Sequence, residues 1–291
     1  MFTGSMVALV TPMKNGKVDE PRIPELVEFQ LTRGTDVICP CGCTGEAATL
    51  THDEQVRIIQ MVVETVNGRA KVVAGTGSNS TEEALHLTRR AKNVGADGAL
   101  MITPYYNKPT QRGLKVHYEK IAAAVDLPIM LYNVPSRTGV NMLPETVVEL
   151  SKIDNIVAIK EASGSIDQVS AILSMCDITV LSGDDSLTLP MLAVGAKGVV
   201  SVAANAAPTE VSALIDSFNR CNMEEAQSIH FQLLPLFKAL FCETNPIPIK
   251  RALSMMGLIE NELRLPLVPL SPEHEPRLRA VLEKLGLLET V

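Results

Sequence analysis

The sequence contains no tryptophan, and aromatic side chains make up only 3% of its 291 residues. A core of this size must therefore be built from aliphatic side chains, which suit parallel strands buried on both faces. No apolar run reaches the roughly 18 residues of a membrane-spanning helix, so we expect no membrane partner. The segment from Met1 to Pro12 has neither a basic n-region nor a cleavage site, and we expect no signal peptide.

Lysine and arginine form no long run and the net charge is −7, so the sequence does not favour a nucleic-acid partner. The six cysteines show no disulfide-scaffold spacing, which indicates free thiols in a reducing cytoplasm. Cys39, Cys41 and Cys43 alternate along a predicted strand, and we expect them to share a face. No histidine or cysteine elsewhere completes a zinc spacing, and we expect no metal and no cofactor.

Eight short, apolar, β-rich runs recur along the chain, with helical patterns between them. The runs are residues 5–12, 36–43, 70–77, 98–104, 128–135, 156–163, 178–185 and 198–205. Thr51 with Glu54 and Ser80 with Glu83 have the spacing of capping boxes. Eight strand–helix units in succession predict a closed (β/α)8 barrel, a TIM barrel. No glycine-rich phosphate loop follows the first strand, which disfavours an open doubly wound sheet.

After Asn205 the strand patterns stop. Residues 208–220 have the pattern of the eighth barrel helix, and three further helices are predicted at 223–241, 246–256 and 272–285. We therefore predict a catalytic barrel over residues 1–222 and a small C-terminal helical domain over 223–291.

Lys160 is the most informative single residue, because barrel enzymes keep their sites at the C-terminal ends of the strands. It ends an otherwise apolar run, and strand alternation puts it on the same face as Ala158 and Ala162. Burial lowers the pKa of a lysine from about 10.4 and releases the neutral amine that attacks carbonyls. The alternative is a lysine paired with Glu161 or with an aspartate at the rim.

Three further features suit Schiff-base chemistry. Tyr132 ends the neighbouring strand, where it can shuttle protons or merely pack at the rim. Arg137 offers a planar fork to a carboxylate, unless it forms a salt bridge within its loop. The turn at 42–45 presents backbone N–H groups as an anion nest, although a tight strand–helix turn also needs glycine.

These residues lie in motifs that run through the chain. The motifs are Met1-Phe2-Thr3-Gly4-Ser5, Gly42-x-Thr44-Gly45-Glu46, Thr103-Pro104-Tyr105-Tyr106, Tyr132-Asn133-Val134-Pro135-Ser136-Arg137-Thr138-Gly139, Ile159-Lys160-Glu161-Ala162 and Asn245-Pro246-Ile247-Pro248. In these motifs the chain closely resembles the dihydrodipicolinate synthase family. The Gly-x-Thr-Gly-Glu motif and the lysine mark the wider pyruvate-aldolase superfamily, whereas the motif that contains Arg137 is more specific.

The resemblance implies a Schiff-base-forming lyase of diaminopimelate and lysine biosynthesis. Lys160 would form an imine with pyruvate, and the derived enamine would attack L-aspartate 4-semialdehyde. Tyr132 would be the proton donor and acceptor. The remaining implied roles concern binding: Thr44 with backbone amides for the pyruvate carboxylate, Arg137 for the semialdehyde carboxylate, and Val200 and Gly183 as matches to pyruvate-pocket positions.

The resemblance also implies a homotetramer, a dimer of dimers. Tyr106 matches a tyrosine that reaches into the site of a neighbouring subunit. The family's proton relay is usually Tyr–Thr–Tyr, and here Cys43 holds the middle position. A thiol is a weaker hydrogen-bond partner than a hydroxyl, so the relay is expected to be less efficient.

Feedback inhibition by L-lysine is a further expectation. The positions that match the family's lysine cleft are His52, Asn79, Glu83 and Tyr105. A serine and a second histidine, common in sensitive members, are Ala47 and Gln55 here, so the match is incomplete.

Two other functions remain open. A sister pyruvate aldolase such as N-acetylneuraminate lyase would share most motifs, but those lyases lack the arginine found here at Arg137. A catalytically idle barrel that binds keto acids would not need both Lys160 and Tyr132.

Overall fold

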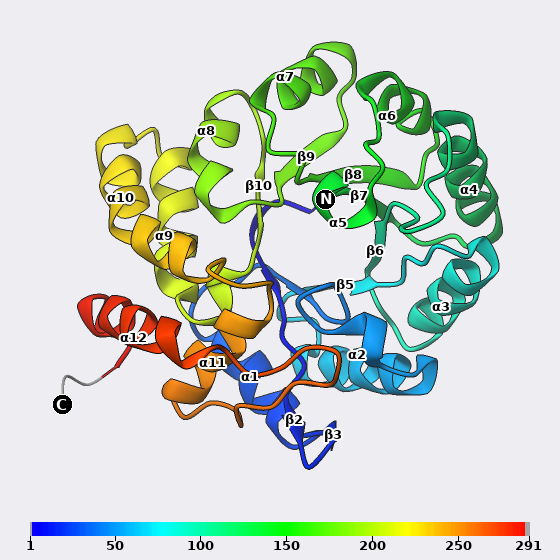
Figure 1. Ribbon diagram of the computed structural model, residues 1–291. Coiled ribbons are helices and arrows are strands. Elements are labelled where there is room, and N and C mark those ends of the chain that lie inside the picture. Colours follow the sequence, from blue (N-terminus) through cyan, green and yellow to red (C-terminus); the bar gives the residue numbers. More distant parts are fainter. Residues whose placement is uncertain (1, 289–291) are drawn as a thin grey trace.

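The computed structural model describes residues 2–288 as a closed barrel of eight parallel strands ringed by helices (Figure 1). The strands are β1 (Gly4–Ala8), β4 (Val37–Cys39), β5 (Lys71–Gly75), β6 (Gly98–Ile102), β7 (Ile129–Asn133), β8 (Ile156–Glu161), β9 (Thr179–Ser182) and β10 (Gly198–Ser201). Each pairs with its sequence neighbour among these eight, and β1 closes the ring by pairing with both β10 and β4. The predicted barrel is confirmed.

Helices alternate with the strands and form the outer layer. They are α1 (Arg22–Leu31), α2 (His52–Val66), α3 (Thr81–Asn93), α4 (Gln111–Ala124), α6 (Pro144–Leu150), α7 (Ile166–Met175), α8 (Thr188–Ala193) and α9 (Pro208–Asn219), and the single turn α5 (Pro135–Thr138) follows β7. Short 3-10 turns are η1 (Ala47–Thr49), η2 (Asp185–Leu187), η3 (Ala203–Asn205) and η4 (Pro272–His274). Within residues 2–288, no helix combines the length and apolar character needed to cross a membrane.

The barrel interior is filled by one aliphatic cluster. Alternate strand residues point inward, as the two-residue period of a strand requires. The inward residues include Met6, Ala8, Val37, Val73, Leu100, Met130, Ala158, Leu181 and Val200. These interior residues are buried, and barrel proteins bind their ligands at the C-terminal strand ends instead.

Of the two capping boxes predicted from the sequence, one forms completely and the other only in part. Thr51 and Glu54 form the complete capping box at the start of α2, as predicted. In the capping box predicted at Ser80, the serine bond forms but the reciprocal bond from Glu83 does not. Ser80 accepts from the backbone N–H of Glu83, but the Glu83 carboxylate accepts from Ser78 Oγ at 2.7 Å instead.

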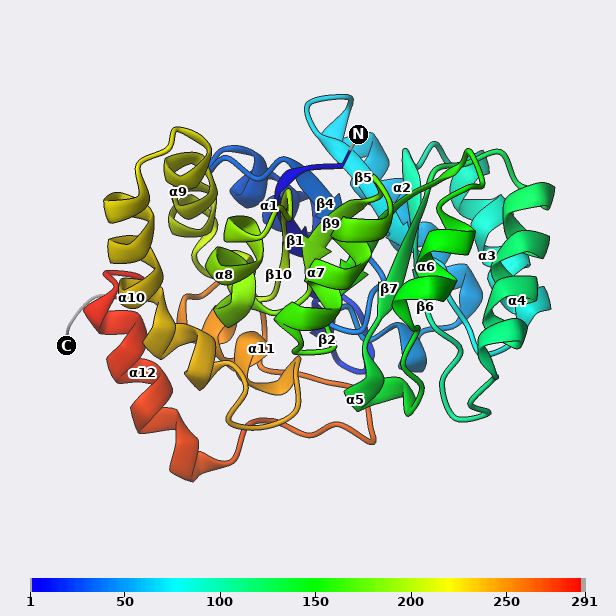
Figure 2. The same cartoon turned by 90° about the horizontal axis from the view of Figure 1, so that it is seen from above.

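The chain after residue 222 is helical, as predicted, in α10 (Met223–Ala239), α11 (Ile247–Met255) and α12 (Glu275–Lys284). Helix α10 packs on α9, and α12 packs on α10. Leu233, Leu253 and Leu278 belong to the same buried cluster as residues of α1 and α2. Figure 2 shows α11 and the segment after it at the end of the barrel where α5 lies. A separate domain boundary after residue 222 stays a prediction.

Candidate active site

Lys160 lies on β8 directly beside Tyr132 of β7 in the strand register. Its side chain is 5% exposed, and its Nζ lies 4.2 Å from the centre of the Tyr132 ring. Alternation along β8 points Lys160 inward with Ala158, as expected from the sequence. The small neighbours leave space for a long side chain in a crowded barrel.

No ion pair holds Lys160 within the described residues. Glu161, the partner in the alternative interpretation, points away and accepts from Asn133 Nδ2, Gln168 Nε2 and the Ser163 N–H. Burial lowers the pKa of Lys160, and Cys43, Cys39, Asp184 and Asp185 oppose that shift by favouring the charged form. The result is an amine more readily neutral than an ordinary lysine.

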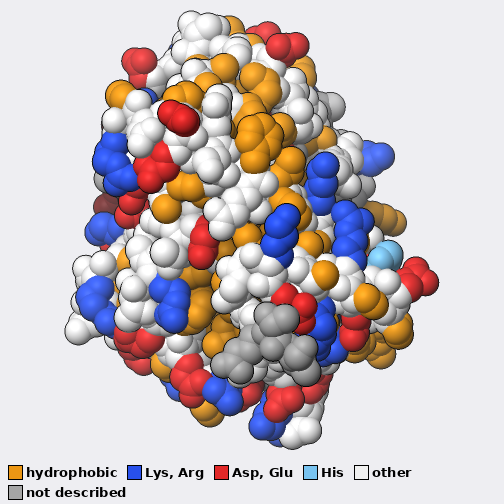
Figure 3. Space-filling view, turned by 90° about the vertical axis from the view of Figure 1, so that its left-hand side faces the viewer, with side chains coloured by type: hydrophobic (Ala, Val, Ile, Leu, Met, Phe, Trp, Pro, Cys, Tyr) orange, Lys and Arg blue, Asp and Glu red, His pale blue; other side chains and the backbone are white. Residues whose placement is uncertain are grey.

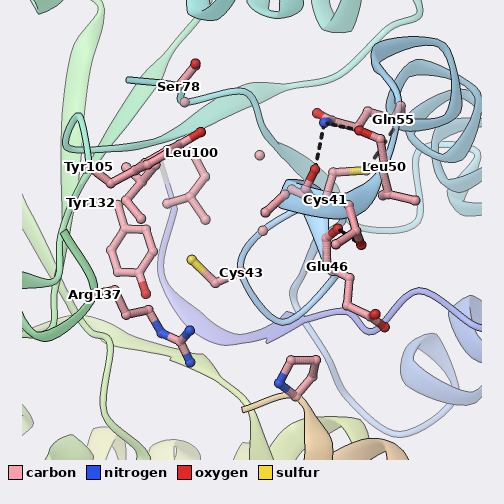
Figure 4. A pocket seen from close by; sticks show the side chains of 18 of the residues that line it. Cys41, Cys43, Glu46, Leu50, Gln55, Ser78, Leu100, Tyr105, Tyr132 and Arg137 are labelled. Carbon is pink, nitrogen blue, oxygen red and sulfur yellow. Dashed lines mark hydrogen bonds between the residues drawn. The ribbon is translucent and has the colours of Figure 1, made fainter. Parts of the chain in front are cut away.

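A cavity of about 490 Å³ opens at the C-terminal ends of the strands. Lys160 does not line it, and Tyr132, whose ring lies 4.2 Å from Lys160 Nζ, is the link between the lysine and the cavity. Tyr132, Arg137 and Cys43 line it, and Figure 4 shows the thiol and the guanidinium on the side of the ring that carries the hydroxyl. Burial is the largest cause that raises the pKa of Tyr132 well above its usual value, and the nearby Arg137 opposes it. Tyr132 therefore carries its proton at neutral pH and can donate it.

The turn that contains Thr44 is held from the far end of the chain. Glu46 has a left-handed backbone (φ +55°), and its buried carboxylate forms an ion pair with the equally buried Lys250 of α11. The second carboxylate oxygen accepts from the backbone N–H of Arg264 at 3.1 Å. Gly45 leaves little room for a side chain, since a Cβ there would lie 3.0 Å from the Cys41 nitrogen. The turn is thus fixed by packing and by the C-terminal helices.

Asn245 joins the two residues expected to bind carboxylates. Arg137 Nη2 donates to the Asn245 backbone oxygen at 3.0 Å. The Asn245 side-chain Nδ2 donates to Thr44 Oγ1, also at 3.0 Å. Arg137 therefore does not form the loop salt bridge of the alternative interpretation, because its hydrogen bond goes to a carbonyl oxygen.

Gly183 approaches Lys160, and Val200 lies in the barrel interior. A Cβ on Gly183 would lie 3.1 Å from Lys160 Cε and 2.5 Å from Ala162 Cβ, so glycine leaves the space that the lysine occupies. Val200 is fully buried in the barrel interior. Neither residue lines the cavity, so their role in pyruvate binding stays a prediction.

Tyr106 projects away from the body of the protomer. It is 89% exposed, has a left-handed backbone (φ +72°), and does not line the cavity beside Tyr132. Its hydroxyl therefore cannot complete a relay within its own chain.

The residues expected to bind L-lysine lie largely in the same cavity. His52, Glu83 and Tyr105 line it, whereas Asn79 does not, and the Asn79 backbone oxygen accepts from Asn107 Nδ2. Gln55 donates to the carbonyl of Ala47, so its amide is already engaged.

The prediction that Cys39, Cys41 and Cys43 share a face is wrong. Strand β4 ends at Cys39, and the left-handed backbone of Cys41 (φ +58°) turns its side chain into the helix layer, where the thiol donates to the Gln55 carbonyl. Burial raises the pKa of Cys39 to about 12 and that of Cys41 higher still. Within residues 2–288, no three His, Cys, Asp or Glu side chains are grouped to hold a metal.

Sequence reasoning missed Lys250, Arg264 and the role of Asn245. A lysine inside the apolar pattern of α11 was an available signal, because a fully buried lysine needs a counter-charge. Arg264 lies outside regular structure, and no pattern marks it.

Comparison with known proteins finds relatives that match nearly the whole length of the chain. The Dihydrodipicolinate synthetase family model matches residues 1–285. A curated 4-hydroxy-tetrahydrodipicolinate synthase of Citrifermentans bemidjiense is 58% identical over 290 residues, which are 99% of this chain and 100% of that protein. The dihydrodipicolinate synthase of Aquifex aeolicus is 52% identical, with a TM-score of 0.97 over 99% of this chain and 100% of that one.

Three similar solved structures add details of their own proteins. The Acinetobacter baumannii enzyme, 44% identical over 99% of each chain or more with a TM-score of 0.97, was solved with pyruvate. The Cyanidioschyzon merolae enzyme, 44% identical over 99% of both chains with a TM-score of 0.96, was solved with lysine bound. A variant 46% identical, covering 99% of this chain and 98% of that one with a TM-score of 0.97, is described as monomeric. By the family model, the full-length relatives and the shared fold, this chain belongs to the dihydrodipicolinate synthetase family.

Proposed function

We propose that Lys160 carries the reaction of this protein, a 4-hydroxy-tetrahydrodipicolinate synthase that condenses pyruvate with L-aspartate 4-semialdehyde in lysine biosynthesis. The observation that carries the assignment is the setting of Lys160, buried at a strand end with its amine over the Tyr132 ring. A neutral amine in such a place attacks a keto carbon.

Lys160, Tyr132 and Thr44 each have a separate role in the proposed reaction. The Lys160 amine attacks C2 of pyruvate, and Tyr132 gives a proton to the departing oxygen, which leaves as water. Loss of a proton from C3 gives the enamine, whose carbon attacks the aldehyde. The amino group of the condensed product then attacks C2, and Lys160 leaves as the free amine. Thr44 and the backbone amides beside it hold the pyruvate carboxylate throughout.

A coupled assay tests this function. Purified protein should consume pyruvate only when L-aspartate 4-semialdehyde is present, and it should not cleave N-acetylneuraminate. Cleavage of the sialic acid without condensation would identify the sister aldolase instead. Pyruvate binding with no turnover of either substrate would indicate an idle barrel.

Arg137→Ala should raise the KM for L-aspartate 4-semialdehyde about tenfold or more, because a hydrogen bond to a charged group contributes roughly 1.5–3 kcal/mol. Trapping of the pyruvate imine by borohydride should survive. Arg137→Lys is the matched variant, since it keeps the charge but loses the planar fork. Unchanged semialdehyde kinetics in the alanine variant would make Arg137 a structural residue that only fixes Asn245.

Cys43→Thr should keep or raise turnover, whereas Cys43→Val should lower it. The thiol lies near the Tyr132 hydroxyl (Figure 4), and a hydroxyl is the better hydrogen-bond partner. Steady-state turnover of the two variants, which differ by one polar atom, is the measurement. Equal rates in both and in the wild type would mean that this side chain relays no proton.

We infer that the protein assembles as a dimer of dimers. Tyr106, exposed and turned away from its own cavity, is available to a neighbouring subunit. A second apolar surface lies on α10, where Phe231 is 66% exposed, and Figure 3 shows apolar side chains in a band over that side of the molecule. Large exposed apolar patches mark interaction sites. Sedimentation of the wild type against Tyr106→Phe and Phe231→Glu would separate the two contacts.

L-lysine is proposed as an effector that binds at the His52 end of the cavity, with its ammonium group at Glu83 and its aliphatic chain against Tyr105. Coupling of about 1–3 kcal/mol between such sites is ordinary.

A cytoplasmic location is proposed from the six free cysteines.

Turnover at fixed substrates should fall partially as L-lysine rises. Glu83→Ala should relieve that inhibition and leave basal turnover largely intact, because the Glu83 carboxylate bonds Ser78 rather than the helix start. Glu82→Ala is the control, since that neighbouring acid pairs with Lys120 on the outer surface. Full activity at tens of millimolar lysine would contradict the proposal. Loss of basal turnover together with inhibition would give Glu83 a supporting role instead.

A further inference from the structure

An irregular segment between α11 and η4, residues 261–270, crosses the end of the barrel where the cavity opens (Figure 1). Pro266 and Leu267 of this C-terminal strap line the cavity, so a movement of the strap changes the cavity wall. Arg264 holds the strap in place, and its side chain is only 18% exposed. No step of the proposed reaction uses this arginine.

Arg264 contacts one short stretch of the chain at three places. Its backbone N–H donates to the Glu46 carboxylate at 3.1 Å, and its Nη1 donates to the Thr49 carbonyl at 3.0 Å. Nη1 and Nη2 also donate to the Glu54 carboxylate, at 2.8 and 2.6 Å, as a bidentate pair of charge-assisted hydrogen bonds. The bond to Arg264 is the largest cause that lowers the pKa of Glu54 to about 2. Glu54 is therefore charged at neutral pH and stays paired with the arginine.

This stretch joins the two parts of the cavity to which different ligands are assigned. Thr44, proposed to hold the pyruvate carboxylate, lies two residues before Glu46. His52, proposed to contact L-lysine, begins α2 and lies two residues before Glu54. Glu54 also completes the capping box of α2, which ties its carboxylate to the helix start. Arg264 therefore connects the turn assigned to one ligand with the helix start assigned to the other.

The chain between these two ends has little stiffness of its own. Its middle is η1, a single 3-10 turn, and such turns have poor hydrogen-bond geometry and often mark hinges. An arginine that is bonded before, within and after this turn fixes the three parts relative to one another. A displacement of the α2 start then moves the Thr44 turn as well, instead of being absorbed in η1.

The strap has a second anchor that does not touch this stretch. The Glu262 carboxylate accepts from the backbone N–H groups of Asn15, at 2.8 Å, and Gly16 in the turn between β2 and β3. The Gly16 carbonyl accepts from Arg264 Nη2 at 3.2 Å. Glu262 thus ties the strap to the hairpin, whereas Arg264 also ties it to residues 46–54, and the two anchors can be removed separately.

We propose that Arg264 is a positioning residue that couples the Thr44 turn to the His52 end of the cavity, so that L-lysine bound at one end alters pyruvate binding at the other. The inference rests on the proposed L-lysine effector and gives that effector a route to the site. Arg264 does not line the cavity, and it acts through Glu46 and Glu54.

The coupling is measured as a ratio of two dissociation constants. Calorimetry gives the dissociation constant of L-lysine with and without saturating pyruvate, and by linkage the same factor describes the effect of L-lysine on pyruvate binding. In the wild type the two constants should differ by about fivefold or more, the lower end of ordinary coupling. In Arg264→Ala they should agree within about twofold, because an effector with equal affinity for both states shifts nothing. Binding of L-lysine without pyruvate should be retained in that variant.

Glu262→Gln is the matched control, because it loosens the same strap from the hairpin and leaves Arg264 in place. It should keep the wild-type ratio. A ratio that falls equally in both variants overturns the proposal, since loosening the strap would then be enough. Arg264→Ala with the wild-type ratio overturns it as well.

Arg264→Lys decides the question where Arg264→Ala does not fold. The lysine keeps a charge beside Glu54 but lacks the planar fork, so its ratio should fall towards one. The wild-type ratio in this variant overturns the proposal.

Turnover of the wild type separates these outcomes from the proposed function. A wild type that turns over but binds no L-lysine refutes the effector and this inference together, and it leaves the synthase assignment intact. L-lysine binding that pyruvate leaves unchanged overturns the coupling alone. Because the ratio is a binding measurement, a wild type without turnover refutes the proposed function, and the ratio still decides the coupling.

Discussion

Replacing Lys160 with alanine should abolish the borohydride-trapped pyruvate adduct and lower turnover by roughly a thousandfold or more, because the covalent route is lost. Lys160 is the buried amine at a strand end beside Tyr132, and Tyr132 lines the cavity. Mass spectrometry of peptides from the reduced wild-type complex should place the adduct on Lys160.

Lys152→Ala is the matched control, since that lysine is exposed in the loop before β8 and should leave both adduct and turnover unchanged. The rate of imine formation should rise with pH through a midpoint below the ordinary lysine pKa of about 10.4. The sign follows from the chemistry: burial lowers the pKa of Lys160, and only the neutral amine attacks. An adduct on any other lysine, or a midpoint at the ordinary value, would contradict the assignment.

Much of the barrel can be predicted because each strand is a short apolar run with its own period. The residues at which the strands end cannot be predicted in the same way. The sequence predicts one strand over residues 5–12, yet β1 ends at Ala8 although Leu9 and Val10 are as buried as the strand itself. Apolar character reports burial, whereas a strand also needs a hydrogen-bonded neighbour, and loops at the barrel ends are buried without one.

A small hairpin escaped prediction although its signal is present in the sequence. Strands β2 (Met13–Lys14) and β3 (Lys17–Val18) are joined by Asn15 and Gly16, both with left-handed backbones. Asn-Gly is the preferred pair for such a two-residue turn. Strands of two residues carry too little alternation to be recognised by period alone.

The half of the site that lies at strand ends follows from one rule, that parallel strands in a barrel end on the same face. That rule alone predicts that Lys160, Tyr132 and Arg137 lie at one end of the barrel. Lys250 and Asn245 come from more than 200 residues beyond the loop they contact. No local pattern places a C-terminal helix over a particular strand end, so these contacts depend on the complete fold.

Lys250→Met should lower the melting temperature by roughly 10 °C, because removing one partner of a buried ion pair costs about 3–5 kcal/mol. Both side chains of the Lys250–Glu46 pair are fully buried, and without Lys250 the Glu46 carboxylate keeps, among residues 2–288, the backbone N–H of Arg264 as its one hydrogen-bond donor. Burial lowers the pKa of Lys250, and the ion pair with Glu46 opposes that shift by favouring the charged amine.

The double variant Glu46→Gln with Lys250→Met should recover most of that loss, since it removes both buried charges together. Its pyruvate KM should nevertheless stay above that of the wild type, because Glu46 directly follows the turn that carries Thr44 and that turn is no longer held to α11. Calorimetry and steady-state kinetics on the three proteins separate the two effects. A Lys250→Met protein that melts with the wild type would show the pair to be dispensable. A double variant with wild-type pyruvate kinetics would show that α11 supports the barrel without positioning its site.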